Sequence, residues 1–194
     1  MPPFSVLHVC LGNICRSPMA ERLFALRVSE RLPQGAEQPV LSFSCGIADW
    51  NIGASMDRSA ARELNSRGGD DSGFRARHMA SEHVESADLI LTATQEQVDY
   101  IAAEYGYALD RTFLIRHFGM IVDTVTQDEL PSGDASPADV YARGTALVKL
   151  ADRRRDIAVP EPLDDPWRGS AAVFTRIGDE IDAALAPLVN RLLP

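Results

Sequence analysis

The sequence predicts an α/β fold: a single-domain, three-layer α/β/α sandwich with a central four-stranded parallel sheet. Short apolar stretches rich in β-branched residues alternate with longer stretches whose apolar residues recur at helical spacing. This alternation is typical of a parallel sheet wrapped by helices. The chain has 194 residues, and 45% of all residues are hydrophobic, which is enough for one sizeable core. We therefore expect residues 1–194 to form one domain.

The first strand and the first helix flank a short loop. Residues 4–9 are short, apolar and β-branched enough to form a buried strand. Ser17 suits the N-cap of a helix and Pro18 suits its first position, and residues 18–31 carry apolar side chains on one helical face. The loop between strand and helix would then lie at the carboxyl edge of the sheet, where such folds bind ligands.

The later elements continue the alternation. Further strands are expected at short apolar runs, near residues 40–44, 88–92 and 112–115. Further helices are expected near residues 57–67, 80–86, 95–104, 137–154 and 170–191. Proline, glycine and aspartate between residues 127 and 137 predict an exposed loop before the helix at 137–154.

Charge and cysteine content exclude several classes of protein. Nineteen basic and 28 acidic residues give a net charge of −9, which argues against nucleic-acid or anionic-membrane partners. Three cysteines, an odd number, do not form a disulfide framework and indicate a reducing compartment. The sequence shows neither a basic-then-apolar leader nor an apolar run of about 18 residues, so we expect a cytoplasmic protein with no membrane span.

The loop after the first strand carries the chemistry. A loop of this length can direct several backbone N–H groups towards a dianion at the start of a helix. Arg16 offers a planar fork that suits two phosphate oxygens. Cys10 lies close to both, which favours its thiolate, and a thiolate beneath a bound phosphoryl group is placed for in-line attack. Ser17 can hydrogen-bond the sulfur when it leaves.

Residues 10–17, together with their flanking strand and helix, resemble the low-molecular-weight protein tyrosine phosphatases, whose signature is Cys-x-Gly-Asn-x-Cys-Arg-Ser. The resemblance covers roughly residues 4–118 and 163–191, and leaves residues 119–162 as an extra loop and helix. It implies a cysteinyl-phosphate intermediate on Cys10, phosphate and transition-state binding by Arg16, and no metal or other cofactor. It also implies phosphotyrosine-containing proteins as substrates, and phosphate or other oxyanions as ligands.

The resemblance further implies an aspartate in a late Asp-Pro pair that serves as general acid and base. Asp-Pro occurs once, at Asp165-Pro166, and Trp167 supplies the aromatic residue that usually follows. Expulsion of a phenolate is slow unless the oxygen is protonated as it leaves, and Asp165 would supply that proton. Asp164 is the competing candidate.

The same resemblance implies a set of substrate-binding residues. These are Leu11, Gly12, Asn13, Ile14, Cys15, Ser17, Trp50 and Trp167. Glycine and asparagine in the loop suit left-handed backbone positions. Ser44 would hold Asn13 in place, and the two tryptophans would flank a phenyl ring.

Some residues depart from the family pattern. Phe74 stands where a polar residue often reaches the loop serine, so we expect Ser17 to lack a partner. Ala93 and Thr94 stand where family members often have Met-Asp, which leaves the orientation of Arg16 open. Arg168 follows the late tryptophan, where it is either solvated or reads acidic residues beside a phosphotyrosine.

Other functions remain as alternatives. Protein-arginine phosphatases of this fold tend to carry threonine at the position of Ile14, and an isoleucine cannot offer a hydroxyl to a guanidinium. Arsenate reductases need further cysteines downstream, but the last one here is Cys45. A non-catalytic phosphate-binding module would need neither a nucleophile nor an acid. A zinc site lacks suitably spaced histidines, and a buried structural Cys10 remains the simplest alternative.

The sequence leaves two properties of the protein open. The oligomeric state cannot be derived from it. Cys10 and Cys15 are close enough in the chain to form a reversible disulfide, which the family resemblance supports; the alternative is that Cys15 is a small apolar residue packed beneath the loop.

Overall fold

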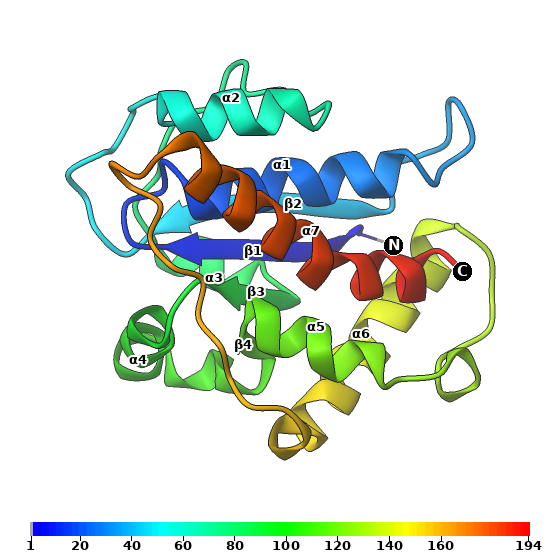
Figure 1. Cartoon of the computed structure of the whole chain (residues 1–194). Helices are drawn as coiled ribbons and strands as arrows, with labels where there is room; N and C mark the ends of the chain where they lie inside the picture. Colours follow the sequence, from blue (N-terminus) through cyan, green and yellow to red (C-terminus); the bar gives the residue numbers. More distant parts are fainter. Residues whose placement is uncertain (1) are drawn as a thin grey trace.

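The computed structural model describes residues 2–194 and contains a four-stranded parallel sheet in the order β2-β1-β3-β4 (Figure 1). The strands are β1 (Phe4–Cys10), β2 (Val40–Gly46), β3 (Leu89–Thr92) and β4 (Thr112–Leu114). The predicted α/β class and the four parallel strands are therefore confirmed. Since all strands run the same way, the carboxyl ends of β1 and β2 meet at one edge of the sheet.

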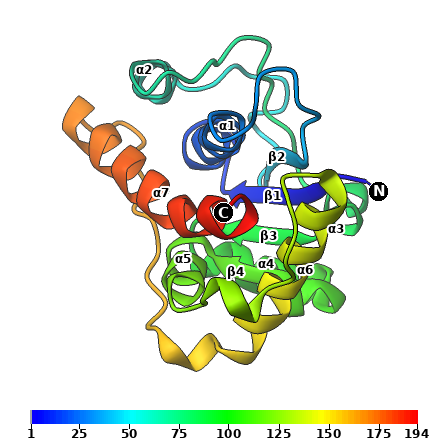
Figure 2. The ribbon, with the colours of Figure 1, turned by 90° about the vertical axis from the view of Figure 1, so that its right-hand side faces the viewer.

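Helices cover both faces of the sheet (Figure 2). The α-helices are α1 (Arg16–Ser29), α2 (Arg58–Ser66), α3 (Ser81–Glu85), α4 (Gln95–Glu104), α5 (Ile115–Asp123), α6 (Pro137–Arg153) and α7 (Ala171–Leu192). Three short 3-10 helices are η1 (Gly106–Arg111), η2 (Gln127–Glu129) and η3 (Arg155–Ile157).

The strands send alternate side chains into two hydrophobic cores. Val6 and Leu91 belong to the larger core, which also holds apolar residues of α1, α5, α6 and α7. Leu7 and Ile90 belong to a smaller core on the opposite face, together with residues of α3 and α4. The sheet is thus buried on both faces, as expected for a parallel sheet.

Two helix predictions were wrong. No helix was predicted at α5, where Ile115, Phe118 and Val122 are buried at helical spacing, because residue 115 was assigned to the preceding strand. The start of α1 was placed too late: the helix begins at Arg16, with Cys15 at its N-cap. Ser17 is therefore inside the first turn of the helix, and its hydroxyl lies within hydrogen-bonding distance of Cys10.

The segment 119–162 is built into the fold through α6 and η3. Gly144 of α6 lies so close to the ring of Phe4 that a Cβ atom would come within 2.5 Å of it. The guanidinium of Arg155 lies 3.9 Å from the ring centroid of Phe113, and Arg154 forms an ion pair with Glu129. Arg154 and Arg155, directly after α6, are therefore bound within the fold.

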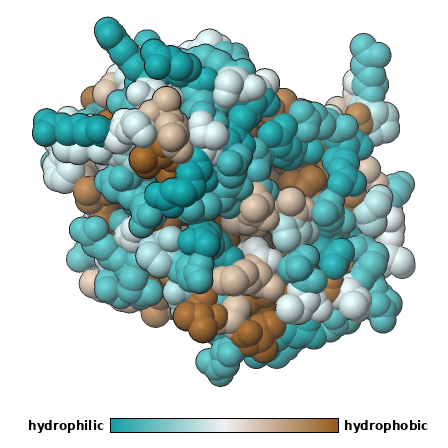
Figure 3. Space-filling view, in the orientation of Figure 1, coloured by the Kyte–Doolittle hydropathy of each residue, from teal (hydrophilic) through white to brown (hydrophobic). Residues whose placement is uncertain are grey.

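The molecular face in Figure 3 is mainly hydrophilic, and its apolar side chains form small, separate patches. Such scattered apolar groups are normal on a protein surface. Among residues 2–194, no helix has the length and apolar character needed to cross a membrane.

Candidate active site

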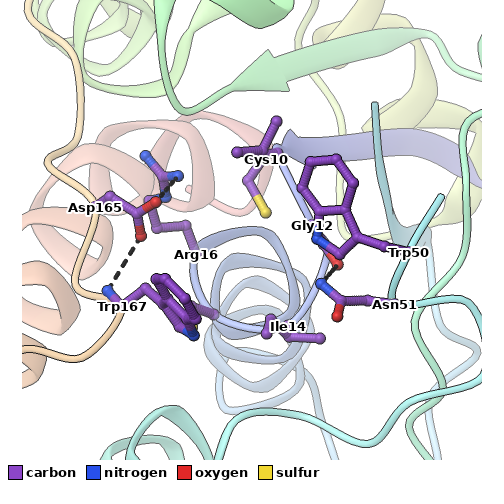
Figure 4. Close-up of a pocket in the computed structure, with 10 residues that line it drawn as sticks. Cys10, Gly12, Ile14, Arg16, Trp50, Asn51, Asp165 and Trp167 are labelled. Atoms are coloured by element: carbon purple, nitrogen blue, oxygen red, sulfur yellow. Dashed lines mark hydrogen bonds and ion pairs between the residues drawn. The ribbon is translucent and has the colours of Figure 1, made fainter. Parts of the chain in front are cut away.

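A pocket of about 380 Å³ opens at the carboxyl end of β1 (Figure 4). Three segments far apart in the sequence build it: the loop between β1 and α1, the turn after β2, and the segment before α7. Its lining residues are Cys10, Leu11, Gly12, Ile14, Cys15, Arg16, Trp50, Asn51, Asp165 and Trp167. The fold thus brings the two predicted motifs into one pocket.

The loop backbone is arranged to receive an anion. The carbonyl groups of Cys10, Leu11, Gly12 and Ile14 accept hydrogen bonds from surrounding segments, at 3.2, 2.9, 3.1 and 2.9 Å. By contrast, the backbone N–H groups of residues 11–15 have no acceptor within residues 2–194. These N–H groups are therefore available to a ligand, directly before the N-terminus of α1, where the helix dipole also favours negative charge.

Cys10 ends β1 at the base of the pocket. Its side chain is buried, and its Sγ lies 3.0 Å from the Oγ atom of Ser17. Ser17 also accepts a hydrogen bond from the side chain of Asn13 at 2.8 Å. The expectation that Ser17 would lack a partner was therefore wrong, because Asn13 takes that role and Phe74 is simply buried in the core.

Asn13 holds the loop from beneath. Its backbone has a φ of 53°, in the left-handed region that asparagine tolerates. Its Nδ2 donates to Ser17 and to Ser44, each at 2.8 Å, and its Oδ1 accepts from the backbone N–H of Arg77. Ser44 in turn donates to the buried Glu21 at 2.5 Å. The predicted support of Asn13 by Ser44 is present.

The same network affects the pKa of Glu21. Burial raises the pKa of Glu21, whereas the Ser44 hydrogen bond and the Arg77 guanidinium oppose that rise. The carboxyl group is therefore held in place by partners on two different segments behind the loop.

Glycine is required at position 12 because a neighbouring side chain comes close to its backbone, and not because the backbone there is left-handed. Its φ is not among the positive values in residues 2–194, so that expectation was wrong. A Cβ atom at Gly12 would lie 2.5 Å from Nδ2 of Asn51, and this amide donates to the Gly12 carbonyl at 3.1 Å. Asn51 was not predicted as a site residue. Its position directly after Trp50, a predicted site residue, is the feature of the sequence that could have identified it.

Arg16 is buried and fixed at one end of its guanidinium. One terminal nitrogen donates to the carbonyl of Leu163 at 3.1 Å, and the other lies 3.1 Å from a carboxylate oxygen of Asp165. The orientation of Arg16, which the sequence left open, is thus set partly by the segment before α7.

Asp165 and Asp164 have different surroundings. Asp165 lines the pocket, pairs with Arg16, and accepts a hydrogen bond from the backbone N–H of Trp167. Asp164 forms an ion pair with Arg176 at 2.9 Å and does not line the pocket. Of the two aspartates, only Asp165 is within reach of a bound ligand.

Two exposed tryptophans flank the pocket mouth. The accessible surface of Trp50 is 69% exposed and that of Trp167 is 53% exposed, and they lie on opposite sides of the pocket in Figure 4. The guanidinium of Arg168 lies 4.1 Å from the Trp167 ring centroid. Tryptophan is rarely left so exposed without a binding role, because burial of its large ring is favourable.

The three cysteines are all free and buried. Burial raises the pKa of the Cys15 thiol and of the Cys45 thiol, so both are protonated at neutral pH. Only Cys10 and Cys15 line the pocket. Among residues 2–194, no group of three or more histidine, cysteine, aspartate or glutamate side chains is placed to hold a metal ion.

Most predicted site residues meet in the pocket. The side chains of Asn13 and Ser17 do not line it. They lie behind the loop and act on its shape.

Comparison with known proteins supports the same interpretation. Residues 5–130 match the family described as low molecular weight phosphotyrosine protein phosphatase. Low molecular weight protein-tyrosine phosphatase A of Mycobacterium tuberculosis is 34% identical over 116 residues, which cover 60% of this chain and 68% of that protein. A protein-arginine-phosphatase of Geobacillus stearothermophilus is 30% identical over 152 residues, which cover 78% and 93%.

A solved structure shares the fold. The tyrosine phosphatase Wzb of Escherichia coli K30, crystallised in complex with sulphate, superimposes with a TM-score of 0.67 at 20% identity. The superposition covers 98% of this chain and 99% of that one.

A parallel sheet covered by helices, with a loop of free N–H groups after its first strand, is typical of an anion-binding α/β protein. The family match makes the assignment narrower. The chain belongs to the low molecular weight phosphotyrosine protein phosphatase family. It is therefore a phosphatase, which is a hydrolase.

Proposed function

We propose that the protein hydrolyses phosphotyrosine in protein substrates through a cysteinyl-phosphate intermediate on Cys10. The observation that carries this proposal is the set of free N–H groups at residues 11–15, with Cys10 at their base and Asp165 opposite. A dianion held by these groups and by the fork of Arg16 would present its phosphorus to the sulfur.

In the first step, Cys10 Sγ attacks phosphorus, the S–P bond forms, and the bond from phosphorus to the phenolic oxygen breaks. Asp165 gives its proton to that oxygen, because a phenolate is otherwise a poor leaving group. Trp50 and Trp167 would enclose the phenyl ring from two sides, which favours an aryl phosphate over a short alkyl one.

In the second step, the Asp165 carboxylate takes a proton from water as the water oxygen attacks phosphorus. The S–P bond breaks, phosphate leaves, and the thiolate is restored. The Ser17 hydroxyl, 3.0 Å from the sulfur, stabilises the developing thiolate. No cofactor enters this scheme.

We also propose that residues 1–194 act as one catalytic domain, in which residues 119–162 are an insert that packs on the sheet. Phosphate and other oxyanions would bind as ligands or product analogues. The three free cysteines support a reducing compartment such as the cytoplasm.

A second candidate substrate is phosphoarginine. It is favoured by the match to the Geobacillus protein-arginine-phosphatase, which reaches over more of this chain than the match to the Mycobacterium enzyme. Ile14 argues against it. This residue lines the pocket with a side chain that cannot hydrogen-bond a guanidinium.

A steady-state assay with phosphotyrosine and phosphoarginine peptides of otherwise equal sequence distinguishes the two candidate substrates. We expect turnover of the phosphotyrosine peptide and near inertness of the other. Ile14→Thr should raise the ratio of phosphoarginine to phosphotyrosine turnover, and Ile14→Val is the matched control without a hydroxyl. Preferential turnover of phosphoarginine by the wild type would overturn the tyrosine assignment.

A further inference from the structure

Arg16, which lines the substrate pocket, also lines another, much smaller cavity. Its volume is about 10 Å³, which is room for one water molecule. Side chains of β1, α1 and β3 line it, among them His8, Arg16 and Thr92, and all its lining residues are buried. The cavity therefore lies in the interior, between the sheet and the base of the active site.

Two polar side chains at this cavity lack partners. Within residues 2–194, neither ring nitrogen of His8 nor the Nε of Arg16 has a hydrogen-bond partner, although each residue is at least 95% buried. Buried polar groups without a partner are costly and rare. Two such residues beside one water-sized cavity therefore indicate that they share a bound water.

We propose that one water in this cavity accepts a hydrogen bond from Arg16 Nε and donates one to a ring nitrogen of His8, which makes His8 a positioning residue for Arg16. Burial lowers the pKa of His8 to about 3, so the ring is neutral at physiological pH. A neutral imidazole has one acceptor nitrogen, which is what the water needs.

The inference rests on the proposed phosphate-binding role of Arg16, and the other contacts of this residue show why positioning matters. Both terminal nitrogens are held by the segment before α7, one by the carbonyl of Leu163 and the other by the half-exposed carboxylate of Asp165. A guanidinium fixed only there would follow every movement of that segment. The water would tie its Nε to His8 in the middle of β1, which pairs with a strand on each side.

The first test is a high-resolution crystal structure of the wild-type protein. We expect density for one water within about 3.2 Å of both Arg16 Nε and a His8 ring nitrogen. A dry cavity would overturn the proposal, whether or not any variant folds.

The second test uses His8→Leu, which removes both nitrogens, with His8→Asn and His8→Gln as conservative variants. For His8→Leu we expect the affinity for inorganic phosphate and kcat/KM each to fall about 10- to 150-fold, as for the loss of one hydrogen bond to a charged group. Either His8→Asn or His8→Gln should restore most of the lost phosphate affinity and kcat/KM. A merely structural His8 would lower Tm and leave phosphate affinity unchanged.

Phe24→Leu is the matched control. The Phe24 ring packs against His8, with 5.9 Å between ring centroids, so this variant disturbs the packing of the imidazole but keeps its nitrogens. It should lower Tm without weakening phosphate binding. Equal losses of phosphate affinity in Phe24→Leu and His8→Leu would contradict the proposal.

Arg16→Lys separates this inference from the proposed function. Lysine has no N–H at the Nε position, so His8→Leu should add no further loss of phosphate affinity in that background. If His8→Leu alone has no effect while Arg16→Lys abolishes binding, the water bridge fails and the phosphatase mechanism stands. If Arg16→Lys binds and turns over phosphate esters normally, the role of Arg16 itself is wrong.

Discussion

The two sides of the active site are built in different ways. The loop between β1 and α1 is tied to β2 through the side chain of Asn13, and the side chains of Asn13 and Ser17 behind the loop are buried. The segment that faces it, residues 163–168, contains no helix or strand. The Asp165 side chain there is 48% exposed.

This difference matches two tasks. Binding a dianion and aligning a nucleophile require donors whose positions do not change, and a buried, cross-linked loop provides them. Proton transfer to different leaving groups tolerates a less constrained carboxylate. We therefore expect changes in the loop to affect every substrate, and changes in the facing segment to depend on the leaving group.

The largest effect is expected at the nucleophile. Cys10→Ser should abolish turnover, because a serine hydroxyl is far less ionised than a thiol, yet inorganic phosphate or vanadate should still bind to the N–H groups and Arg16. Calorimetry and a steady-state assay on the same sample test both statements. Substantial activity in this variant would contradict the cysteinyl-phosphate mechanism.

The next largest effect is expected at Asp165, in the segment that faces the loop. Asp165→Asn should slow hydrolysis of phenyl phosphate by about 10²- to 10⁴-fold, the usual range for general acid catalysis. The loss should shrink for phenols that depart readily without a proton. Asp164→Asn is the control on the adjacent residue, since Asp164 pairs with Arg176 outside the pocket. The opposite pattern would assign the acid to Asp164.

A smaller effect is expected behind the loop. Ser44→Ala would remove one hydrogen-bond partner from the amide of Asn13 and one from the carboxylate of Glu21. We expect it to lower the free energy of unfolding by about 1–3 kcal/mol and to reduce kcat for all aryl phosphates alike. Ser42→Ala, on the same strand, removes only a bond to a backbone carbonyl.

Denaturant unfolding and a series of leaving groups measure the outcome of Ser44→Ala. A loss of kcat that varied with the leaving group would mean that the two sides of the site are not independent.

The same comparison explains what the sequence could predict. Loop residues 10–17 form one continuous stretch, so their chemistry and spacing are visible in the chain, and Asp165 was found through its proline. The sheet followed from apolar runs. Contacts across the fold were not visible: the carbonyl of Leu163 on Arg16, the amide of Asn51 on Gly12, and the cavity beside His8 all join segments far apart in sequence.

The smallest effect is expected for Cys15→Ala, which tests whether Cys15 protects Cys10 from irreversible oxidation. Peroxide converts an accessible thiolate to a sulfenic acid, and attack by Cys15 on oxidised Cys10 would form a disulfide and release water. Burial raises the pKa of Cys15, so its thiolate is scarce at neutral pH and the protection should be partial and improve as pH rises. Wild type and Cys15→Ala are treated with peroxide at several pH values and then with a thiol reductant. Wild type should recover more activity than the variant, with a gap that widens at higher pH, whereas equal recovery at every pH would show that Cys15 is only a packed apolar residue.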